Sequence, residues 1–438
     1  MHKIERLLQT LAPKGVGFRK LGDIILSLKT GLNPRKFFKL NTPNANNYYV
    51  TVRELEEYTI KFTHQTDRID DNALSLCLKR SNLEKDDILF SGTGTIGKVS
   101  IIKENPNNWA IKEGIYSIKP NKKIVFPRFL MFCFENLNIQ NDIKSKSFGG
   151  IVKSISMSDL QQITIPIPPL EIQQEIVKIL DAFTELNTEL NTELKARKKQ
   201  YEYYQNMLLD FKNIHQNRKD AKMSAKAYPK RLKTLLQTLA PKGVEFKKIG
   251  ELFKRNKGIN ITAAQMKELH SEIGKVRIFA GGATKADINY KDISKKDIIN
   301  CESVIIKSRG NIGFEYYNQP FSHKNEIWSY SSKTNQMLVK FLYYYLSNNQ
   351  DYFQKLAQSS SVKLPQLSVS DTDEYEVPVP PLEIQQEIVK ILDAFTELNT
   401  ELNTELNTEL NARKKQYEYY REKLLTFKPL TPHKEVKK

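Results

Sequence analysis

The segment GTGTIGK at residues 92–98 has the spacing of a phosphate-binding loop, in which backbone amides and a lysine hold the phosphates of a nucleotide. Such a loop also needs a Ser or Thr after the lysine to hold Mg²⁺, and a helix that begins there. Val99 stands at the hydroxyl position, and VSIIK at 99–103 is typical of a strand. The matching segment SRGNIG at 308–313 is not followed by lysine. A tight glycine turn between two strands therefore explains both segments better than a nucleotide site.

Other catalytic signatures are absent from the sequence. The segment NPNNW at 105–109 has Asn where the second proline of an amino-methyltransferase motif would stand. There is no G-x-S-x-G, no HExxH and no paired-acid nuclease motif. The six histidines are dispersed, and Cys77, Cys133 and Cys301 lack metal-ligand spacing. We expect no catalytic residue and no metal site in this chain.

Side chains suited to DNA lie near the two glycine turns and ahead of two long predicted helices. Arg, Lys, Asn and Gln can read base edges or neutralise phosphates. The candidates for DNA contact are Ser91, Thr93, Thr95, Lys98, Lys144, Lys146, Ser147 and Lys153 in the first half, and Ser308, Arg309, Asn311, Gln358, Ser361 and Lys363 in the second. For any single candidate, a solvated surface position is the alternative.

Blocks of identical sequence frame these candidates and show that the chain is a tandem duplication. Residues 7–16 (LLQTLAPKGV) recur at 235–244, residues 168–194 (PPLEIQQEIVKILDAFTELNTELNTEL) recur at 380–406, and residues 196–204 (ARKKQYEYY) recur at 412–420. The tracts between these blocks, roughly 17–167 and 245–379, differ almost everywhere. Two variable tracts therefore lie inside a constant frame.

The longest shared block predicts a long helix in each copy. Paired prolines followed by an acidic residue favour a helix start. Apolar residues then recur at steps of four and three, which is the spacing of one helix face or of a coiled-coil seam. These residues are Ile172, Ile176, Ile179, Phe183, Leu186 and Leu190, with Ile384, Ile388, Ile391, Phe395, Leu398 and Leu402 in the second copy. We expect the two helices to pair antiparallel along this seam. The alternative is that each helix packs only on its own domain.

A tandem Thr-Glu-Leu-Asn repeat lies inside each helix. The first copy has three units from Thr184, the third ending in Lys195, and the second copy has four, from Thr396 to Asn411. One extra unit lengthens a helix by about 6 Å and rotates the rest of the helix by about 40°, because four residues exceed one turn of 3.6. The helix length therefore differs between the two copies.

Composition places the chain among globular proteins with an anionic partner. The 438 residues suffice for two or three domains, and their net charge of +18 favours nucleic acid or an anionic surface. A lysine-rich genome is the alternative source of that charge. The few unpaired cysteines, together with the absence of a long apolar stretch or signal peptide, favour the cytoplasm and argue against a membrane partner.

Strand and helix patterns alternate within each variable tract. Residues 87–91, 98–103 and 303–308 suit strands, whereas 128–135 and 338–346 suit amphipathic helices. We therefore expect an α+β chain with one mixed α/β domain in each half. The predicted boundaries are 1–167 for the first domain, 168–211 for the first helix, 212–231 for a basic linker, 232–379 for the second domain, 380–427 for the second helix and 428–438 for a basic tail.

The order of these blocks resembles the DNA-specificity subunit of Type I restriction–modification systems. The resemblance rests on ISMSD at 155–159 leading to IPIPPLEIQQ at 165–174, and on LSVSD at 367–371 leading to VPVPPLEIQQ at 377–386. The turns GTIG at 94–97 and GNIG at 310–313 also resemble family motifs. The resemblance covers nearly the whole chain. The block that opens each long helix is specific to this family, whereas the glycine turns are only moderately specific to it.

The resemblance implies two target-recognition domains held apart by two antiparallel coiled-coil helices with pseudo-two-fold symmetry. Each domain would read one half of a split double-stranded DNA site, and the helices would dock two methyltransferase (modification) subunits, which restriction subunits would join. S-adenosylmethionine, ATP and Mg²⁺ would belong to those partners, and this chain would not be an enzyme. Removing one Thr-Glu-Leu-Asn unit should shift the DNA spacer by about one or two base pairs, at roughly 3.4 Å per step. The alternatives are a free-standing coiled-coil DNA-binding regulator and a nucleotide-dependent enzyme that uses residues 92–98.

Overall fold

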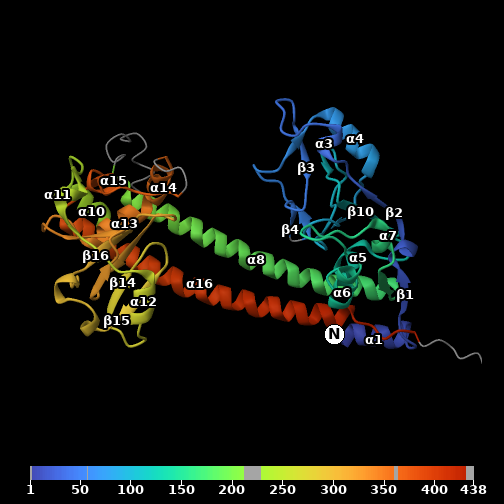
Figure 1. Cartoon of the computed structure of the whole chain (residues 1–438). Helices are drawn as coiled ribbons and strands as arrows, with labels where there is room; N and C mark the ends of the chain where they lie inside the picture. Colours follow the sequence, from blue (N-terminus) through green and yellow to red (C-terminus); the bar gives the residue numbers. More distant parts are fainter. Residues whose placement is uncertain (1, 57, 212–227, 360–363, 431–438) are drawn as a thin grey trace, which may run out of the picture. The chain divides into compact units, whose positions relative to one another are not determined.

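The computed structural model describes residues 2–56, 58–211, 228–359 and 364–430. These residues form two compact units, of which unit 1 is Met1–Asn191 with Asn407–Lys438 and unit 2 is Thr192–Leu406. Both long helices are divided between the units, so each unit holds one mixed domain and segments of both helices (Figure 1). The predicted linker and basic tail fall mostly outside the described residues.

Unit 1 is built on two small sheets covered by short helices. Its four-stranded antiparallel sheet has the order β2-β10-β7-β8, and a three-stranded sheet has the order β6-β3-β9. The elements ahead of the long helices are α1 (His2–Leu11), β1 (Gly17–Lys20), α2 (Leu21–Ile24), β2 (Ile25–Thr30), α3 (Pro34–Phe37), β3 (Asn47–Val50), β4 (Leu55–Glu56), β5 (Thr59–Ile60), β6 (Arg68–Ile69), α4 (Asp71–Ser81), β7 (Ile88–Ser91), β8 (Val99–Ile101), β9 (Trp109–Ile111), β10 (Ile115–Pro120), α5 (Pro127–Cys133), α6 (Leu137–Ser145), α7 (Met157–Gln161) and β11 (Thr164–Ile167).

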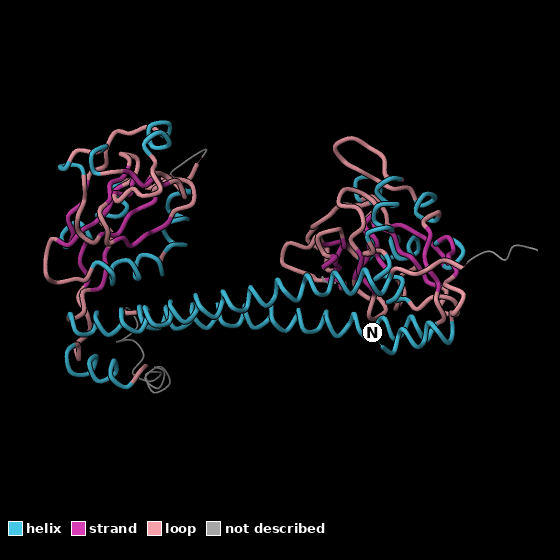
Figure 2. The backbone as a smooth tube through the Cα atoms, turned by 90° about the horizontal axis from the view of Figure 1, so that it is seen from below, coloured by secondary structure: helices cyan, strands magenta, loops and turns pink. Residues whose placement is uncertain are grey.

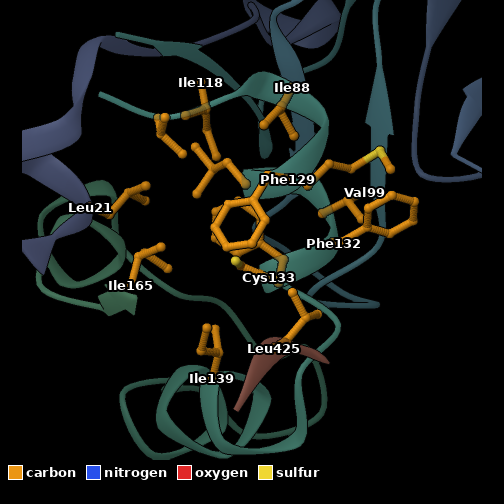
Figure 3. Close-up of a cluster of buried hydrophobic side chains, with 14 of the residues drawn as sticks. Leu21, Ile88, Val99, Ile118, Phe129, Phe132, Cys133, Ile139, Ile165 and Leu425 are labelled. Atoms are coloured by element: carbon orange, nitrogen blue, oxygen red, sulfur yellow. The ribbon is translucent and has the colours of Figure 1, made fainter. Parts of the chain in front are cut away.

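The core of unit 1 lies between the four-stranded sheet and α5. Proline opens α5 at a position that needs no backbone donor, and every residue of the helix except Arg128 is buried. Figure 3 shows Phe129, Phe132 and Cys133 of this helix packed with Ile88 of the sheet and with Leu425, which comes from the second long helix. The core of the first domain is therefore completed by residues far along the chain.

Unit 2 repeats this plan with different side chains. Its four-stranded antiparallel sheet has the order β13-β19-β16-β17, and a three-stranded sheet has the order β15-β14-β18. Figure 2 shows strands and short helices interleaved in each domain. The elements are α10 (Lys230–Leu239), β12 (Phe246–Lys248), α11 (Ile249–Leu252), β13 (Phe253–Asn256), α12 (Ala263–Leu269), β14 (Val276–Phe279), β15 (Lys285–Ile288), η1 (Tyr290–Asp292), η2 (Lys295–Asp297), β16 (Ser303–Lys307), β17 (Gly313–Tyr317), β18 (Phe321–His323), β19 (Trp328–Ser332), α13 (Val339–Asn348), α14 (Gln350–Ser359), α15 (Val369–Asp373) and β20 (Glu376–Pro378).

Within each unit, a segment of the long helix α8 (Leu170–Leu209) packs antiparallel against a segment of the long helix α16 (Leu382–Leu425) (Figures 1 and 2). In unit 1 the ring of Phe183 stacks on that of Tyr420, with 5.6 Å between ring centroids. In unit 2 Phe395 stacks on Tyr204 at 5.3 Å. These four residues occupy equivalent positions of the duplicated block. The predicted fold, two mixed α/β domains with two long antiparallel helices, is therefore confirmed.

A buried glutamine fixes the start of each long helix to its own domain. The side chain of Gln173 donates to the carbonyls of Pro168 and Ile124, and accepts from the amide of Phe126. In unit 2 Gln385 bonds Pro380, Gln336 and Leu338 in the same way. Both side chains are fully buried. Because a buried amide must be satisfied, this clamp gives a physical reason for the shared EIQQ sequence.

The apolar stripe of each helix divides between two partners. Ile172 and Ile176, like Ile384 and Ile388, are buried in the core of their own domain. Farther along, Phe183 and Phe395 contact the other helix. Ile179, Ile391, Leu190 and Leu402 are half-buried, whereas Leu186 and Leu398 are exposed. The expected single seam is thus corrected. The first residues of each apolar stripe pack in the core of a domain, and the later ones contact the other helix. One leucine of each stripe, Leu186 or Leu398, is exposed to solvent.

Candidate nucleic-acid interface

The glycine turn of unit 1 joins β7 to β8. Gly94 and Gly97 have φ values of +80° and +89°, which side-chain-bearing residues rarely adopt. Gly92 lies against the ring of Tyr116, where an added Cβ would lie only 2.3 Å from a ring carbon. The hydroxyl of Ser91 donates to the carbonyl of Thr95 and accepts from the amide of Lys98. Local hydrogen bonds therefore close this turn.

The strand on each side of the turn excludes the nucleotide-binding alternative, because a phosphate-binding loop leads into a helix. Ser91 also requires a correction. Its side chain is fully buried and its hydroxyl is used within the turn, so it does not contact DNA in this conformation. Thr93 and Thr95, by contrast, are exposed on the turn.

A second segment, residues 144–155, lies against the turn. The amide of Gly94 donates to the carbonyl of Lys153 at 2.8 Å, and the amide of Ile155 donates to Gly92 at 2.9 Å. The two segments border a hollow of about 270 Å³ lined by Gly94, Ile96, Gly97, Gln140, Ile143, Lys144, Ser147 and Lys153. The structure thus brings together three of the predicted residues, Lys144, Ser147 and Lys153, that are far from the turn in sequence.

The cations near this hollow are not equivalent. Lys144 and Lys153 are exposed, whereas Lys146 pairs with Asp142 at 2.7 Å. The hydroxyl of Ser147 donates to the carbonyl of Ile143 at 2.7 Å. Lys98 lines a different hollow, of about 550 Å³, together with Tyr58, Glu135 and Tyr417. Lys98, predicted as a DNA contact beside the glycine turn, therefore borders a different hollow from Lys144 and Lys153. This second hollow is also lined by Thr184 of α8 and Lys414 of α16.

Unit 2 builds the same arrangement with other side chains. The amide of Gly310 donates to Pro365 and that of Leu367 to Ser308, at 2.8 and 2.9 Å. Ser308 is buried and its hydroxyl donates to the carbonyl of Glu326, so it too is corrected as a DNA contact. Arg309 and Asn311 are exposed on the turn.

The remaining candidates of unit 2 follow its turn in sequence. Gln358 is exposed near the end of α14, whereas Ser361 and Lys363 lie outside the described residues. The side chain of Gln354 on the same helix accepts from the amide of Ile312 at 2.8 Å, which fixes the glycine turn to α14.

Burial raises the pKa of several titratable groups in unit 1. Burial, followed by the charge of Glu135, raises the pKa of Tyr58, which remains a hydrogen-bond donor to that carboxylate. Burial raises the pKa of the Cys77 thiol to about 11, and burial also raises the pKa of Cys133. These shifts keep each group protonated at neutral pH, which is the opposite of what a nucleophile requires. Such side chains can donate hydrogen bonds and fill space.

Sequence reasoning overlooked three apolar residues next to the candidates. Phe148, Ile151 and Val152 are exposed, although large apolar side chains are usually covered. In unit 2 Leu364 is exposed at the position that corresponds to Val152. The signal in the sequence was the pair Gly149-Gly150, which separates Phe148 from Ile151 and Val152 and indicates a tight turn.

Comparisons with known proteins match most of the chain to a single family. The family described as "Type I restriction modification DNA specificity domain" matches residues 13–199 and 241–412. A putative type I restriction enzyme specificity subunit of Haemophilus influenzae is 32% identical over 317 residues, which are 68% of this chain and 72% of that protein. The specificity subunit of a type I restriction enzyme of Escherichia coli is 29% identical over 314 residues, 66% of this chain and 70% of that protein.

Solved structures share the fold. The S subunit of a type I restriction–modification system from M. genitalium matches with a TM-score of 0.52 at 18% identity, covering 94% of this chain and 96% of that one. A chain from a study of type I complex assembly and conformational transition matches with a TM-score of 0.54 at 16% identity, covering 94% and 97%. No helix within the described ranges has both the length and the apolar character needed to cross a lipid bilayer. None of these relatives supports the free regulator or the nucleotide-dependent enzyme.

Proposed function

Because the chain belongs to the DNA-specificity subunits of type I restriction–modification systems, we propose that each of its two domains reads one half of a bipartite DNA site. One observation carries this proposal. Both units fix a glycine turn to a following segment by the same backbone bonds, at Gly94–Lys153 and at Gly310–Pro365, but present different side chains there. A constant scaffold that displays unlike polar groups suits recognition of two unlike half-sites.

The proposed DNA contacts are the exposed polar residues beside the turns. In unit 1 these are Thr93, Thr95, Lys144 and Lys153, and in unit 2 they are Arg309, Asn311 and Gln358. The lysines would neutralise phosphates, and the arginine and amides have the geometry to read base edges. The net charge of +18 supports the electrostatic part of this binding.

The long helices are proposed to dock two modification subunits. One of the related structures belongs to a study of the complex assembly of a type I system, which supports an assembled state. Leu186 and Leu398, at equivalent positions of the repeated block, are exposed and offer the same apolar contact twice. Methyl transfer from S-adenosylmethionine and ATP- and Mg²⁺-dependent cleavage would belong to the partner subunits. This chain would then contribute recognition and no chemistry of its own.

Methylome sequencing tests the proposal in a host that carries the cognate modification subunits. Adding the gene should create one new bipartite adenine-methylated motif. A variant in which residues 17–167 are replaced by the corresponding tract of another relative should change one half of that motif only. The absence of any new motif, with folded cognate subunits present, would refute the proposal.

Binding measurements separate this function from that of a free regulator. The chain with modification subunits should bind a duplex of the motif with an affinity that falls steeply as salt rises. Lys144→Ala with Lys153→Ala should lower that salt slope by about two. The matched control is Lys146→Ala, because Lys146 is already paired with Asp142. Tight sequence-specific binding by the chain without any partner would favour the regulator instead.

A further inference from the structure

The tip of the loop between α6 and α7 carries an apolar cluster in solvent. We call Phe148, Ile151 and Val152 the apolar tip. Their exposed fractions are 57%, 105% and 59%. Exposing a side chain of this size forgoes about 1.5–3 kcal/mol of burial. Three neighbouring apolar residues left uncovered therefore indicate a surface that is covered by a partner.

The apolar tip is firmly held. Phe148 and Ser154 exchange two backbone hydrogen bonds, each 2.8 Å long, which close the loop into a hairpin. Gly149 has a φ of +106°, and an added Cβ there would lie 2.4 Å from the carbonyl oxygen of Val152. The next residue, Lys153, accepts the hydrogen bond from Gly94. The tip is therefore braced directly on the glycine turn that we propose to face DNA.

Cations flank the apolar tip. Lys144 and Lys153 are exposed beside the hollow that the turn and the loop border. Asp142, the acidic residue of this region, is already paired with Lys146. A duplex offers the complementary chemistry, because its phosphates are anionic and its stacked base faces are apolar. An apolar protein groove would not complement the lysines.

Unit 2 places an apolar residue at the same point of the same scaffold. Leu364 is 51% exposed and precedes Pro365, which accepts the hydrogen bond from Gly310. A Cβ added to Gly310 would meet the Leu364 side chain at 3.9 Å. Two domains with unlike recognition tracts thus both carry an exposed apolar side chain one residue before the segment's hydrogen bond to the glycine turn. The recurrence of an exposed apolar residue at this position favours a contact that both domains make with their half-sites.

We propose that the apolar tip is a wedge, in which Ile151 and Val152 enter a DNA groove at the first half-site and press between adjacent base pairs. The inference rests on the proposed DNA recognition. Unstacking one base step costs a few kcal/mol, so the inserted group must be apolar and rigidly supported. Ile151 and Val152 supply the apolar surface, and the hairpin and glycine turn supply the support. Lys144 and Lys153 neutralise the phosphates beside the step.

The experiment uses the full chain assembled with its modification subunits, and duplexes of the methylated motif with 2-aminopurine at successive positions of each half-site. Methylation by the wild-type complex is measured first. A failure at that stage counts against the proposed function and not against the wedge. The wild-type complex should then raise the 2-aminopurine fluorescence at one step of the first half-site.

Ile151→Ala with Val152→Ala should abolish that rise and weaken binding about tenfold or more, since two fully covered side chains are truncated. Thermal unfolding should be unchanged, because both side chains are exposed in the free protein. Leu26→Ala is the matched control, since Leu26 is 66% exposed on β2, at the edge of the four-stranded sheet opposite β8. Leu364→Ala should change the fluorescence at the second half-site only.

Three results would overturn the wedge. The first is wild-type affinity in the double variant when the wild-type complex methylates the motif. The second is a loss of affinity on replacing thymine by uracil without any unstacking signal, which would assign the tip to methyl contacts in the major groove. The third is binding of the free chain to vesicles containing phosphatidylserine that the double variant loses, which would assign the tip to a lipid surface.

Discussion

Arg421 ties α16 to the first domain, and its replacement should destabilise unit 1 by about 2 kcal/mol. Its guanidinium lies 2.9 Å from the carboxylate of Glu135, and the two side chains are 14% and 21% exposed. Burial, the largest single influence, would lower the pKa of Arg421, but the combined attraction of Glu135 and its neighbours, including Glu422, raises it. Removing one partner of a fully buried pair costs about 3–5 kcal/mol, and an exposed pair contributes about 0.2–1 kcal/mol. The partial exposure of this pair places Arg421→Gln between those limits.

The two tryptophans allow each unit to be followed by itself. The sequence contains only two, Trp109 in unit 1 and Trp328 in unit 2. In a Trp328→Phe background, the fluorescence of Trp109 reports the unfolding of unit 1 in urea. Arg421→Gln should lower the midpoint of that transition without changing its slope. In a Trp109→Phe background, the transition of unit 2 should stay where it was.

A double-mutant cycle with Glu135→Gln isolates the pair. The coupling energy should be about 1–2 kcal/mol, because the two charged groups touch and share Tyr58 and Glu422 as neighbours. Arg413→Gln is the control, since Arg413 pairs with Glu409 one turn away on the helix surface. Arg413→Gln should lower the free energy of unfolding by about 0.5 kcal/mol or less. A coupling energy below about 0.5 kcal/mol would refute the reasoning, because Arg421 would then act only by filling space.

Three further predictions concern the turn, a buried carboxyl and the helix repeat. Burial raises the pKa of Asp87 to about 6, so the folded carboxyl holds its proton where the unfolded one has lost it, and stability falls as pH rises from about 4 to 6. The free energy of unfolding of Asp87→Asn, measured in urea, should therefore be about 1–3 kcal/mol higher than that of the parent at pH 7.5. Below about pH 4 the two values should be equal. Gly92→Ala should lower the free energy of unfolding of unit 1 by about 1–3 kcal/mol in urea, because the added Cβ meets the Tyr116 ring. An unchanged midpoint of that transition would contradict this prediction. Deleting residues 400–403 removes about 6 Å of helix and should shift the spacer of the methylated motif by about one or two base pairs. An unchanged spacer in the methylome would confine the helices to docking.

The duplicated blocks predicted the long helices well because their signals are local. Proline pairs, an acidic first turn and a continuing apolar stripe lie within each block, and α8 and α16 begin two residues after the first proline of each pair. Strands at 88–91 and 303–307 were predicted for the same reason. The division of the apolar stripe between domain and helix was not predictable, because it depends on where the core of each domain lies.

The candidate interface was predicted by residue type but not by placement. Ser91 and Ser308 were chosen for their hydroxyls, but each hydroxyl satisfies a backbone carbonyl inside the fold. Lys98 lies one residue past the glycine turn, but it borders a hollow that includes Glu135 and Tyr417, which are far from it in sequence. The apolar tip was overlooked because apolar residues were expected in the core. Exposure, rather than residue type, identifies it.

The closure of unit 1 by residues 407–430 has a consequence for synthesis of the chain. Tyr417, Leu424 and Leu425 belong to the core of the first domain, and the amides of Val16 and Leu430 bond Lys428 and Val16 across the two ends of that unit. Unit 2, by contrast, is continuous in sequence. Translation proceeds at about 5–20 residues per second, so roughly ten seconds or more separate the synthesis of the first domain from that of the end of α16. During that time one face of the core of the first domain stays uncovered. A nascent chain that stops early would leave that face open to chaperones and proteases, so only a chain read through α16 can bury the first core that it began.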